Sequence, residues 1–255
     1  MKRAFTAFLL IPSVVAIIFG GPMWLFAAVV LLLAVLCFHE YSAIAAAQGV
    51  QIPEAVGHLA GAVLLFFPTP DWRLLALIAI FSMVWGLRAP DQRDALPQAA
   101  LLFLGIVYVY GAWRCALYLR TLDAWWIFFA VSINWVGDSA AFFVGKAFGK
   151  HKMAPRVSPS KTWEGAAAAL VLAVIYGVLL LGWVSPSTPK WQLALVSLVA
   201  NLAGQFGDLA ESAMKRGAGL KDSGHMLPGH GGWLDRLDSS LFSMPAVALY
   251  VSLQP

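Results

Sequence analysis

The sequence predicts an all-α fold, a polytopic membrane helix bundle of about nine transmembrane helices with a cytoplasmic N-terminus. Of the 255 residues, 60% are hydrophobic and only 12% are charged, and the mean hydropathy is +0.77. Apolar segments recur from the beginning of the chain to its end. The basic residues are divided unevenly between the two predicted sides of the bilayer. Together these observations indicate a protein whose solvent is the bilayer.

Nine apolar segments succeed one another, and each is predicted to form one helix because a span needs about 20 predominantly apolar residues. They comprise residues 4–20, 22–38, 55–68, 72–87, 98–118, 123–143, 164–184, 190–213 and 237–253. Gly20, Gly21 and Pro22 predict a tight turn between the first two segments. No clear small-residue cleavage site follows the first segment, so it is predicted to be retained as a membrane helix. Several segments are short for a full span, which leaves the count open by about one or two.

The placement of lysine and arginine predicts the orientation of these helices. If the N-terminus is cytoplasmic, thirteen basic residues lie on the inner side: Lys2, Arg3, Arg88, Arg93, Lys146, Lys150, Lys152, Arg156, Lys161, Lys215, Arg216, Lys221 and Arg236. The outer loops hold three, Arg73, Arg120 and Lys190, and Arg114 lies near the outer end of its helix. This excess on the inner side follows the positive-inside rule.

Polar residues interrupt the later apolar segments at helical spacing. At 100° per residue, one stripe of the eighth segment contains Asn201, Gln205, Asp208, Ser212 and Lys215. A polar stripe in a membrane helix is predicted to face a cavity or the bundle interior, because a lipid-facing carboxylate is expensive. Asn134 and Asp138 form a similar pair in the sixth segment. The alternative for both sets is a buried polar pair that only holds helices together.

Two predicted cytoplasmic loops have the composition of a phosphate site. Residues 156–165, RVSPSKTWEG, place hydroxyl groups and a lysine before a helix, where free N–H groups and the helix dipole favour an anion. The alternative is ordinary capping by Ser160 or Thr162, with Glu164 in the first turn. In residues 228–238, glycines permit close backbone approach, and Asp235 and Asp238 flank a basic residue. Carboxylates beside basic residues suggest a polyphosphate bound to Mg²⁺.

These stretches resemble the signature of the CDP-diacylglycerol synthase family, also called phosphatidate cytidylyltransferase. The resemblance rests on Ser212-Ala-Met-Lys-Arg216, Lys221-Asp222-Ser-Gly224, Leu227-Pro-Gly-His-Gly-Gly232 and Asp235-Arg-Leu-Asp238. Residues 138–149 and 152–165 are similar to a second stretch of the same family. It covers the C-terminal half, and residues 1–130 match only in hydropathy. Trp233 departs from the family, which usually has a smaller aliphatic residue there.

The resemblance implies that CTP and phosphatidate give CDP-diacylglycerol and pyrophosphate, with Mg²⁺, at the cytoplasmic face of the cell's inner membrane. The expected catalytic residues are Asp208, Asp235, Lys221, Arg236 and His230, with Asp208 and Asp235 also as metal ligands. The expected substrate-binding residues are Ser158, Ser160, Lys161, Thr162, Lys215, Asp138, Asp222 and Asp238. Residues 1–130 are expected to form N-terminal membrane helices and residues 131–255 the catalytic region. His39 and Glu40 are expected to be interfacial polar residues.

Two alternatives remain at this point. One is a CTP-dependent transferase that acts on a different lipid phosphate, because the signature says little about the lipid tails. The other is a transporter whose intramembrane Asn201, Gln205 and Asp208 line a pathway. The substrates and the lipid bilayer are the expected partners, no nucleic acid is expected, and a homo-oligomer is left open.

Overall fold

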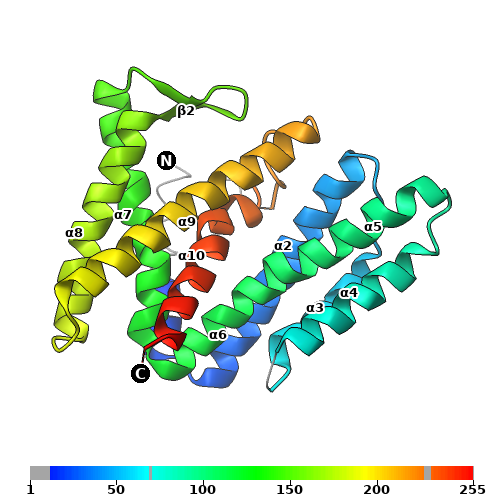
Figure 1. Cartoon of the computed structure of the whole chain (residues 1–255), viewed down its shortest axis with the longest axis horizontal. Coiled ribbons are helices and arrows are strands. Elements are labelled where there is room, and N and C mark those ends of the chain that lie inside the picture. The colour runs from blue at the N-terminus through cyan, green and yellow to red at the C-terminus, as the bar shows by residue number, and fades with distance from the viewer. Residues whose placement is uncertain (1–11, 69–70, 227–230, 255) are drawn as a thin grey trace. The chain divides into compact units, whose positions relative to one another are not determined.

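The computed structural model describes residues 12–68, 71–226 and 231–254, and this part of the chain is all-α except for one short β-hairpin. Figure 1 shows the helices, which are α2 (Met23–Ala47), α3 (Glu54–Phe66), α4 (Trp72–Gly86), α5 (Gln92–Gly105), the π-helical η1 (Ile106–Gly111), α6 (Ala112–Leu122), α7 (Ala124–Phe148), α8 (Trp163–Val184), α9 (Lys190–Gly217) and α10 (Leu234–Ser252). Residues 12–20 are also helical. Each predicted apolar segment therefore contains a helix in its described part.

Five helical segments are long and apolar enough to cross a membrane. Among the described residues these are Met23–Ala47, Gln92–Leu122, Ala124–Phe148, Trp163–Val184 and Lys190–Gly217. Gln92–Leu122 joins α5, η1 and α6 without a break, so the predicted segment 98–118 is longer at both ends. The chain is thus a multi-pass membrane protein, and α3 and α4 are shorter apolar helices.

The chain divides into two compact units. Of the described residues, unit 1 contains those within 21–117 and 214–236, and unit 2 contains those within 12–20, 118–213 and 237–254. The glycine-rich signature loop connects α9 to α10, and its described residues, 221–226 and 231–233, therefore belong with the N-terminal helices α2 to α5. A boundary between units falls inside α6, inside α9 and inside α10.

Glycines bring the helices of unit 1 close together. A Cβ atom at Gly57 would overlap the ring of Phe38, and one at Gly61 would overlap the ring of Tyr110. Both rings are fully buried, and the Tyr110 hydroxyl lies 2.7 Å from Nδ1 of His58. Helices in an apolar solvent associate through such close packing, because burial of apolar surface gives them little drive.

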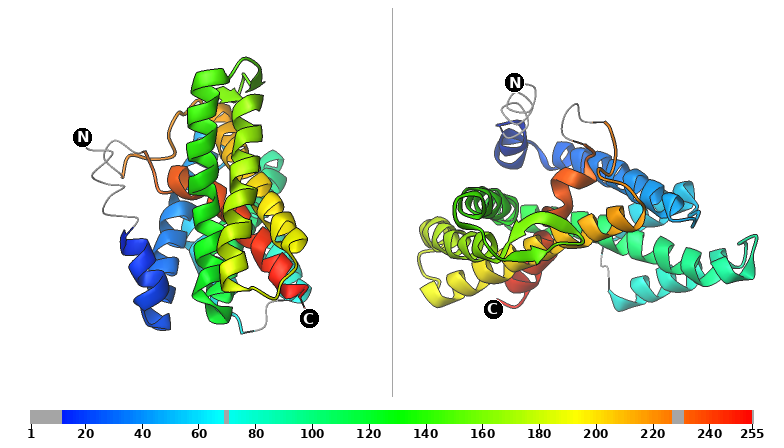
Figure 2. Two further views of the ribbon diagram at one scale, coloured as in Figure 1. Left: turned by 90° about the vertical axis from the view of Figure 1, so that its left-hand side faces the viewer. Right: turned by 90° about the horizontal axis from the view of Figure 1, so that it is seen from above.

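Helices α7 and α8 lie side by side in unit 2 and join through an antiparallel hairpin of β1 (Lys152–Ala154) and β2 (Ser158–Thr162) (Figure 2). Residues 158–162, predicted to be part of a loop, form a strand instead. The extended backbone ends at Thr162, whose hydroxyl accepts a hydrogen bond from the N–H of Gly165 at 3.2 Å. Thr162 is therefore the N-cap of α8, as the capping alternative predicted.

The polar stripe of α9 faces the protein interior or a cavity, as predicted, and its residues 201–212 do so within unit 2. Asn201 is 2% exposed and accepts a hydrogen bond at 2.8 Å from Gln205, one turn further along. A Cβ atom at Gly204 would overlap the side-chain oxygen of Asn134 on α7. The amide of Asn134 donates to the hydroxyl of Ser243 on α10 at 2.8 Å. Hydrogen-bonded polar side chains and small residues thus meet where these helices cross.

We expect Gly204→Ala to destabilise the protein by about 1–3 kcal/mol, because its methyl group would displace the buried amide of Asn134. Gly182→Ala is the matched control, since a Cβ atom there meets only a Leu193 methyl at 3.8 Å. Thermal unfolding of both purified variants in detergent measures the difference. Equal melting temperatures for the two variants would show that this helix crossing tolerates a larger residue.

Candidate functional site

A cavity of about 510 Å³ in unit 2 collects several of the predicted site residues. Its walls come from the end of α7, the hairpin, the start of α8 and α9. Five predicted residues line it: Asp138, Ser160, Lys161, Thr162 and Asp208. Ser158, at the other end of β2, does not. The hairpin therefore brings the middle and end of the predicted phosphate-binding stretch to the polar stripe of α9.

An ion pair joins the two sides of this cavity. Nζ of Lys161 lies 2.6 Å from Oδ2 of Asp208, and the two side chains are 24% and 32% exposed. The hydroxyl of Ser212 donates to Oδ1 of Asp208 at 3.3 Å. Because the pair is partly exposed in a cavity, its ammonium and its carboxylate are both within reach of a ligand.

The start of α8 forms the cavity wall next to Lys161. A Cβ atom at Gly165 would lie 2.9 Å from the backbone oxygen of Ala141, so α7 and α8 approach closely here. Glu164, in the first turn, accepts from the backbone N–H of His151 at 3.2 Å and lies 2.6 Å from its ring. Since Thr162 caps the helix, Ser160 and Lys161 are the other polar side chains of β2 that line this cavity.

A second cluster lies in unit 1, around Asp235 in the first turn of α10. Asp235 forms an ion pair with Lys215, and its Oδ2 accepts from the N–H groups of Ser223 and Gly232, each at 2.8 Å. Burial alone would raise the pKa of Asp235, but Lys215 and the two N–H donors hold this pKa below its usual value. The side chain is 5% exposed, so this carboxylate is charged and almost enclosed.

Glu40, which was expected to be an interfacial polar residue, is buried within this second cluster. Glu40 lies on α2 and is 3% exposed. Its carboxylate accepts from the hydroxyl of Ser223 at 2.7 Å and from the N–H groups of Trp233 and Leu234 at 2.9 and 2.8 Å. The available signal was an acid within a long apolar segment, which must find polar partners. Its neighbour His39 is half exposed and lies 2.6 Å from Glu54.

The remaining predicted residues lie around these clusters or beyond them. Lys221, Asp222 and Arg236 are exposed in unit 1. Asp238 is buried in unit 2, where it accepts from the N–H of Ser239 at 2.7 Å. His230 lies outside the described residues. The structure thus gathers most predicted residues into two clusters, with Asp208 in unit 2 and Asp235 in unit 1.

The donor set of these clusters fits Mg²⁺ better than a transition metal. No group of three His, Cys, Asp or Glu side chains suited to a metal occurs among residues 12–68, 71–226 and 231–254. Mg²⁺ needs only one or two protein carboxylates and completes its coordination with water and phosphate oxygens. Asp208 fits this role because it is partly exposed in a cavity. Asp235 already accepts from three donors, so a metal there would compete with Lys215.

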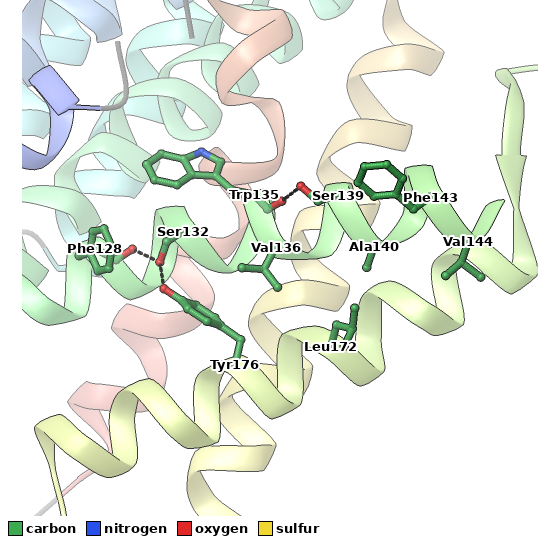
Figure 3. A pocket seen from close by; sticks show the side chains of 10 residues that line it. All are labelled: Phe128, Ser132, Trp135, Val136, Ser139, Ala140, Phe143, Val144, Leu172 and Tyr176. Carbon is green, nitrogen blue, oxygen red and sulfur yellow. Dashed lines mark hydrogen bonds between the residues drawn. The ribbon is translucent and has the colours of Figure 1, made fainter. Parts of the chain in front are cut away.

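A second hollow in unit 2 is an apolar groove of about 550 Å³ between α7 and α8 (Figure 3). Its main polar groups already bind one another, since the hydroxyls of Ser132 and Tyr176 lie 2.6 Å apart. Ser139 donates to the backbone oxygen of Trp135 at 2.7 Å. None of the predicted site residues lines this groove. The polar cavity at Lys161 and Asp208 is therefore the better candidate for phosphate chemistry.

Comparison with known proteins agrees with the resemblance seen in the sequence. The cytidylyltransferase family matches residues 1–254 of the chain. A phosphatidate cytidylyltransferase of Bacillus subtilis (strain 168) is 40% identical over 182 residues, which are 70% of this chain and 68% of that protein. A protein of the same name from Staphylococcus aureus (strain COL) is 38% identical over 174 residues, 68% of this chain and 67% of that protein.

Proposed function

The chain belongs to the cytidylyltransferase family, and from this premise we infer that it condenses CTP with phosphatidate to give CDP-diacylglycerol and pyrophosphate. The observation that supports this most directly is the Lys161–Asp208 pair, which faces a polar cavity at the ends of long apolar helices. A cation beside a carboxylate suits a metal-bound triphosphate, and the apolar helices suit a lipid substrate. The relatives give no support to a transporter or to a different lipid phosphate.

The reaction forms one P–O bond and breaks another. A phosphate oxygen of phosphatidate attacks the α-phosphorus of CTP, and the bond from that phosphorus to the bridging oxygen breaks, so that pyrophosphate leaves. A phosphomonoester has a second pKa of about 6, so the attacking oxygen is largely ionised at neutral pH and needs no strong base. The chain's residues therefore have to orient two anionic substrates and offset their charge.

Three lysines, Lys146, Lys152 and Lys161, line the unit 2 cavity. We assign the phosphate contact to Lys161, which would meet a phosphate oxygen as a point charge. Ser160 would donate its hydroxyl to the same group, from the same strand. Lys215, Lys221 and Arg236 are proposed as phosphate contacts in unit 1, together with His230, which lies outside the described residues. Asp138, Asp222 and Asp238 are proposed as supporting residues for the bound nucleotide, and Ser158 as a further donor.

We propose that Asp208 in unit 2 and Asp235 in unit 1, each within its own cluster, are ligands of Mg²⁺. When bound, the ion would neutralise charge on the phosphate groups. The negative charge of Asp208 is neutralised by an ion pair with Lys161. The negative charge of Asp235 is neutralised by an ion pair with Lys215. In each case, a metal ion held by the carboxylate would leave the neighbouring lysine able to contact a phosphate oxygen.

We also propose that the N-terminus and both clusters lie on the cytoplasmic side of the cell's inner membrane, with about nine spans in all. The support is the distribution of basic residues, thirteen on the inner side against three in the outer loops. CTP is a cytosolic nucleotide, so its binding site must open to that side.

The test of the proposed function is an assay of the purified protein in detergent with labelled CTP, phosphatidate and Mg²⁺. We expect a labelled CDP-lipid and pyrophosphate in equal amounts. Other lipid phosphates in parallel reactions measure the lipid preference. Absence of any labelled lipid from a well-folded protein, with every lipid phosphate tried, would contradict the proposal.

Asp208→Asn and Asp235→Asn should each lower turnover by several orders of magnitude, because the amide keeps the size of the side chain and loses its charge. The measurement is CDP-lipid formation across a magnesium titration. Asp91→Asn is the control, since Asp91 only caps α5 by accepting from the N–H of Arg93. Near-normal turnover at an unchanged magnesium requirement would remove that aspartate from the metal site.

Single cysteines at positions 150 and 73 test the orientation, in a chain whose Cys37 and Cys115 are replaced by serine. A membrane-impermeant thiol reagent added to intact cells should label position 73 and spare position 150. Permeabilised cells should show labelling at both positions. Labelling of position 150 from outside the intact cells would reverse the proposed orientation.

A further inference from the structure

Glu40 binds both ends of the glycine-rich signature loop. Its Oε2 accepts from the hydroxyl of Ser223 at 2.7 Å, close to where the loop begins. The same oxygen accepts from the N–H of Leu234 at 2.8 Å, and Oε1 accepts from the N–H of Trp233 at 2.9 Å, where the loop enters α10. One carboxylate of α2 therefore joins Ser223 to Trp233 and Leu234, which lie more than 180 positions later in the chain than Glu40.

The loop backbone is shaped to this carboxylate. A Cβ atom at Gly232 would overlap Oε2 of Glu40, and one at Gly224 would lie 2.7 Å from Oε1. Both glycines therefore allow the backbone at residues 224 and 232 to approach the acid. The hydroxyl of Ser223 and the N–H groups of Trp233 and Leu234 all donate to Glu40, a pattern that a carboxylate with two acceptor oxygens satisfies and a neutral amide does not.

Ser223 connects Glu40 to the candidate catalytic carboxylate. The Ser223 hydroxyl donates to Glu40 and accepts from the N–H of Asp235 at 3.3 Å, while the Ser223 N–H donates to Oδ2 of Asp235 at 2.8 Å. Gly232, which lies against Glu40, donates its N–H to the same Oδ2 at 2.8 Å. Asp235 in turn pairs with Lys215. The position of the Asp235–Lys215 pair thus depends on the two loop ends that Glu40 holds.

We propose that Glu40 is a positioning residue for the transfer reaction: it fixes the signature loop so that Asp235 and Lys215 are held ready for the metal-bound triphosphate. Glu40 acts through Ser223 and the loop backbone and does not itself touch substrate. The proposal rests on the proposed function. It gives the N-terminal helices a part in nucleotide binding, whereas the sequence indicated only membrane embedding for them.

Kinetics of Glu40→Gln test the proposal, because the variant keeps the size of the side chain but turns one acceptor into a donor that faces N–H or hydroxyl groups. We expect kcat/KM for CTP to fall about 10- to 100-fold, with a higher KM for CTP and an unchanged KM for phosphatidate. Glu40→Asp retains both acceptors and should recover part of the loss. Ser223→Ala combined with Glu40→Gln should cost little more than either change alone, since both break one connection.

Glu54→Gln is the matched control, because Glu54 lies in the same unit, is 39% exposed and pairs with His39 and His58 instead of the loop. It should leave both KM values unchanged. A merely structural role for Glu40 would reduce the amount of active enzyme at constant KM. A Glu40→Gln variant with the wild-type KM for CTP would therefore overturn the proposal.

Hydrogen exchange supplies a readout that needs no catalysis. In Glu40→Gln, peptides covering residues 231–236 should exchange faster than in the wild type, while peptides of α7 should not change. Glu54→Gln should match the wild type in both regions. An unchanged rate of hydrogen exchange at residues 231–236 in Glu40→Gln would by itself contradict the proposal that Glu40 fixes the loop. If the wild-type protein formed no CDP-lipid, the proposed function would fail, and the exchange result would still decide whether Glu40 holds the loop.

Discussion

An acidic side chain enclosed in an apolar protein needs a charge or several hydrogen-bond donors beside it, and this constraint organises both clusters. Glu40 has a hydroxyl and two backbone N–H groups, and Asp235 has a lysine and two backbone N–H groups. Asp208 has Lys161. Removing the donors would leave a buried charge that costs several kcal/mol, on the order of 3–5. The signature loop supplies hydrogen-bond donors to Glu40 and Asp235, and the hairpin supplies Lys161 to Asp208.

The same polar groups that stabilise the clusters are suited to bind an anionic substrate. Lys161 and Lys215 each neutralise one aspartate in the protein alone, and a metal bound at that aspartate would leave the ammonium group for phosphate. Each lysine–aspartate ion pair holds its ammonium and carboxylate groups in position and has no net charge. Preorganised charge of this sort is what a phosphoryl-type transfer needs most, because orienting the substrates and offsetting their charge do most of the work.

Small residues allow the clusters to form. Gly224 and Gly232 admit the carboxylate of Glu40, while Gly204 admits the amide of Asn134 in the neighbouring unit. Glycine in a membrane helix lets two backbones approach, and glycine in the loop lets backbone N–H groups reach a side chain. One residue type therefore serves both helix packing and the polar network.

The sequence by itself determined the all-α membrane fold, the approximate helices and the identity of most residues in the two clusters, because hydropathy, spacing and the signature are local properties. Tertiary structure alone decided that Ser158–Thr162 pairs as a strand, that Lys161 meets Asp208, and that Glu40 binds a loop 183 or more positions away. No periodicity connects Glu40 to Ser223, since their contact is set by which helices pack together. An acidic residue within an apolar segment predicts that hydrogen-bond donors or a cation lie beside it, but only the folded chain specifies which donors reach it.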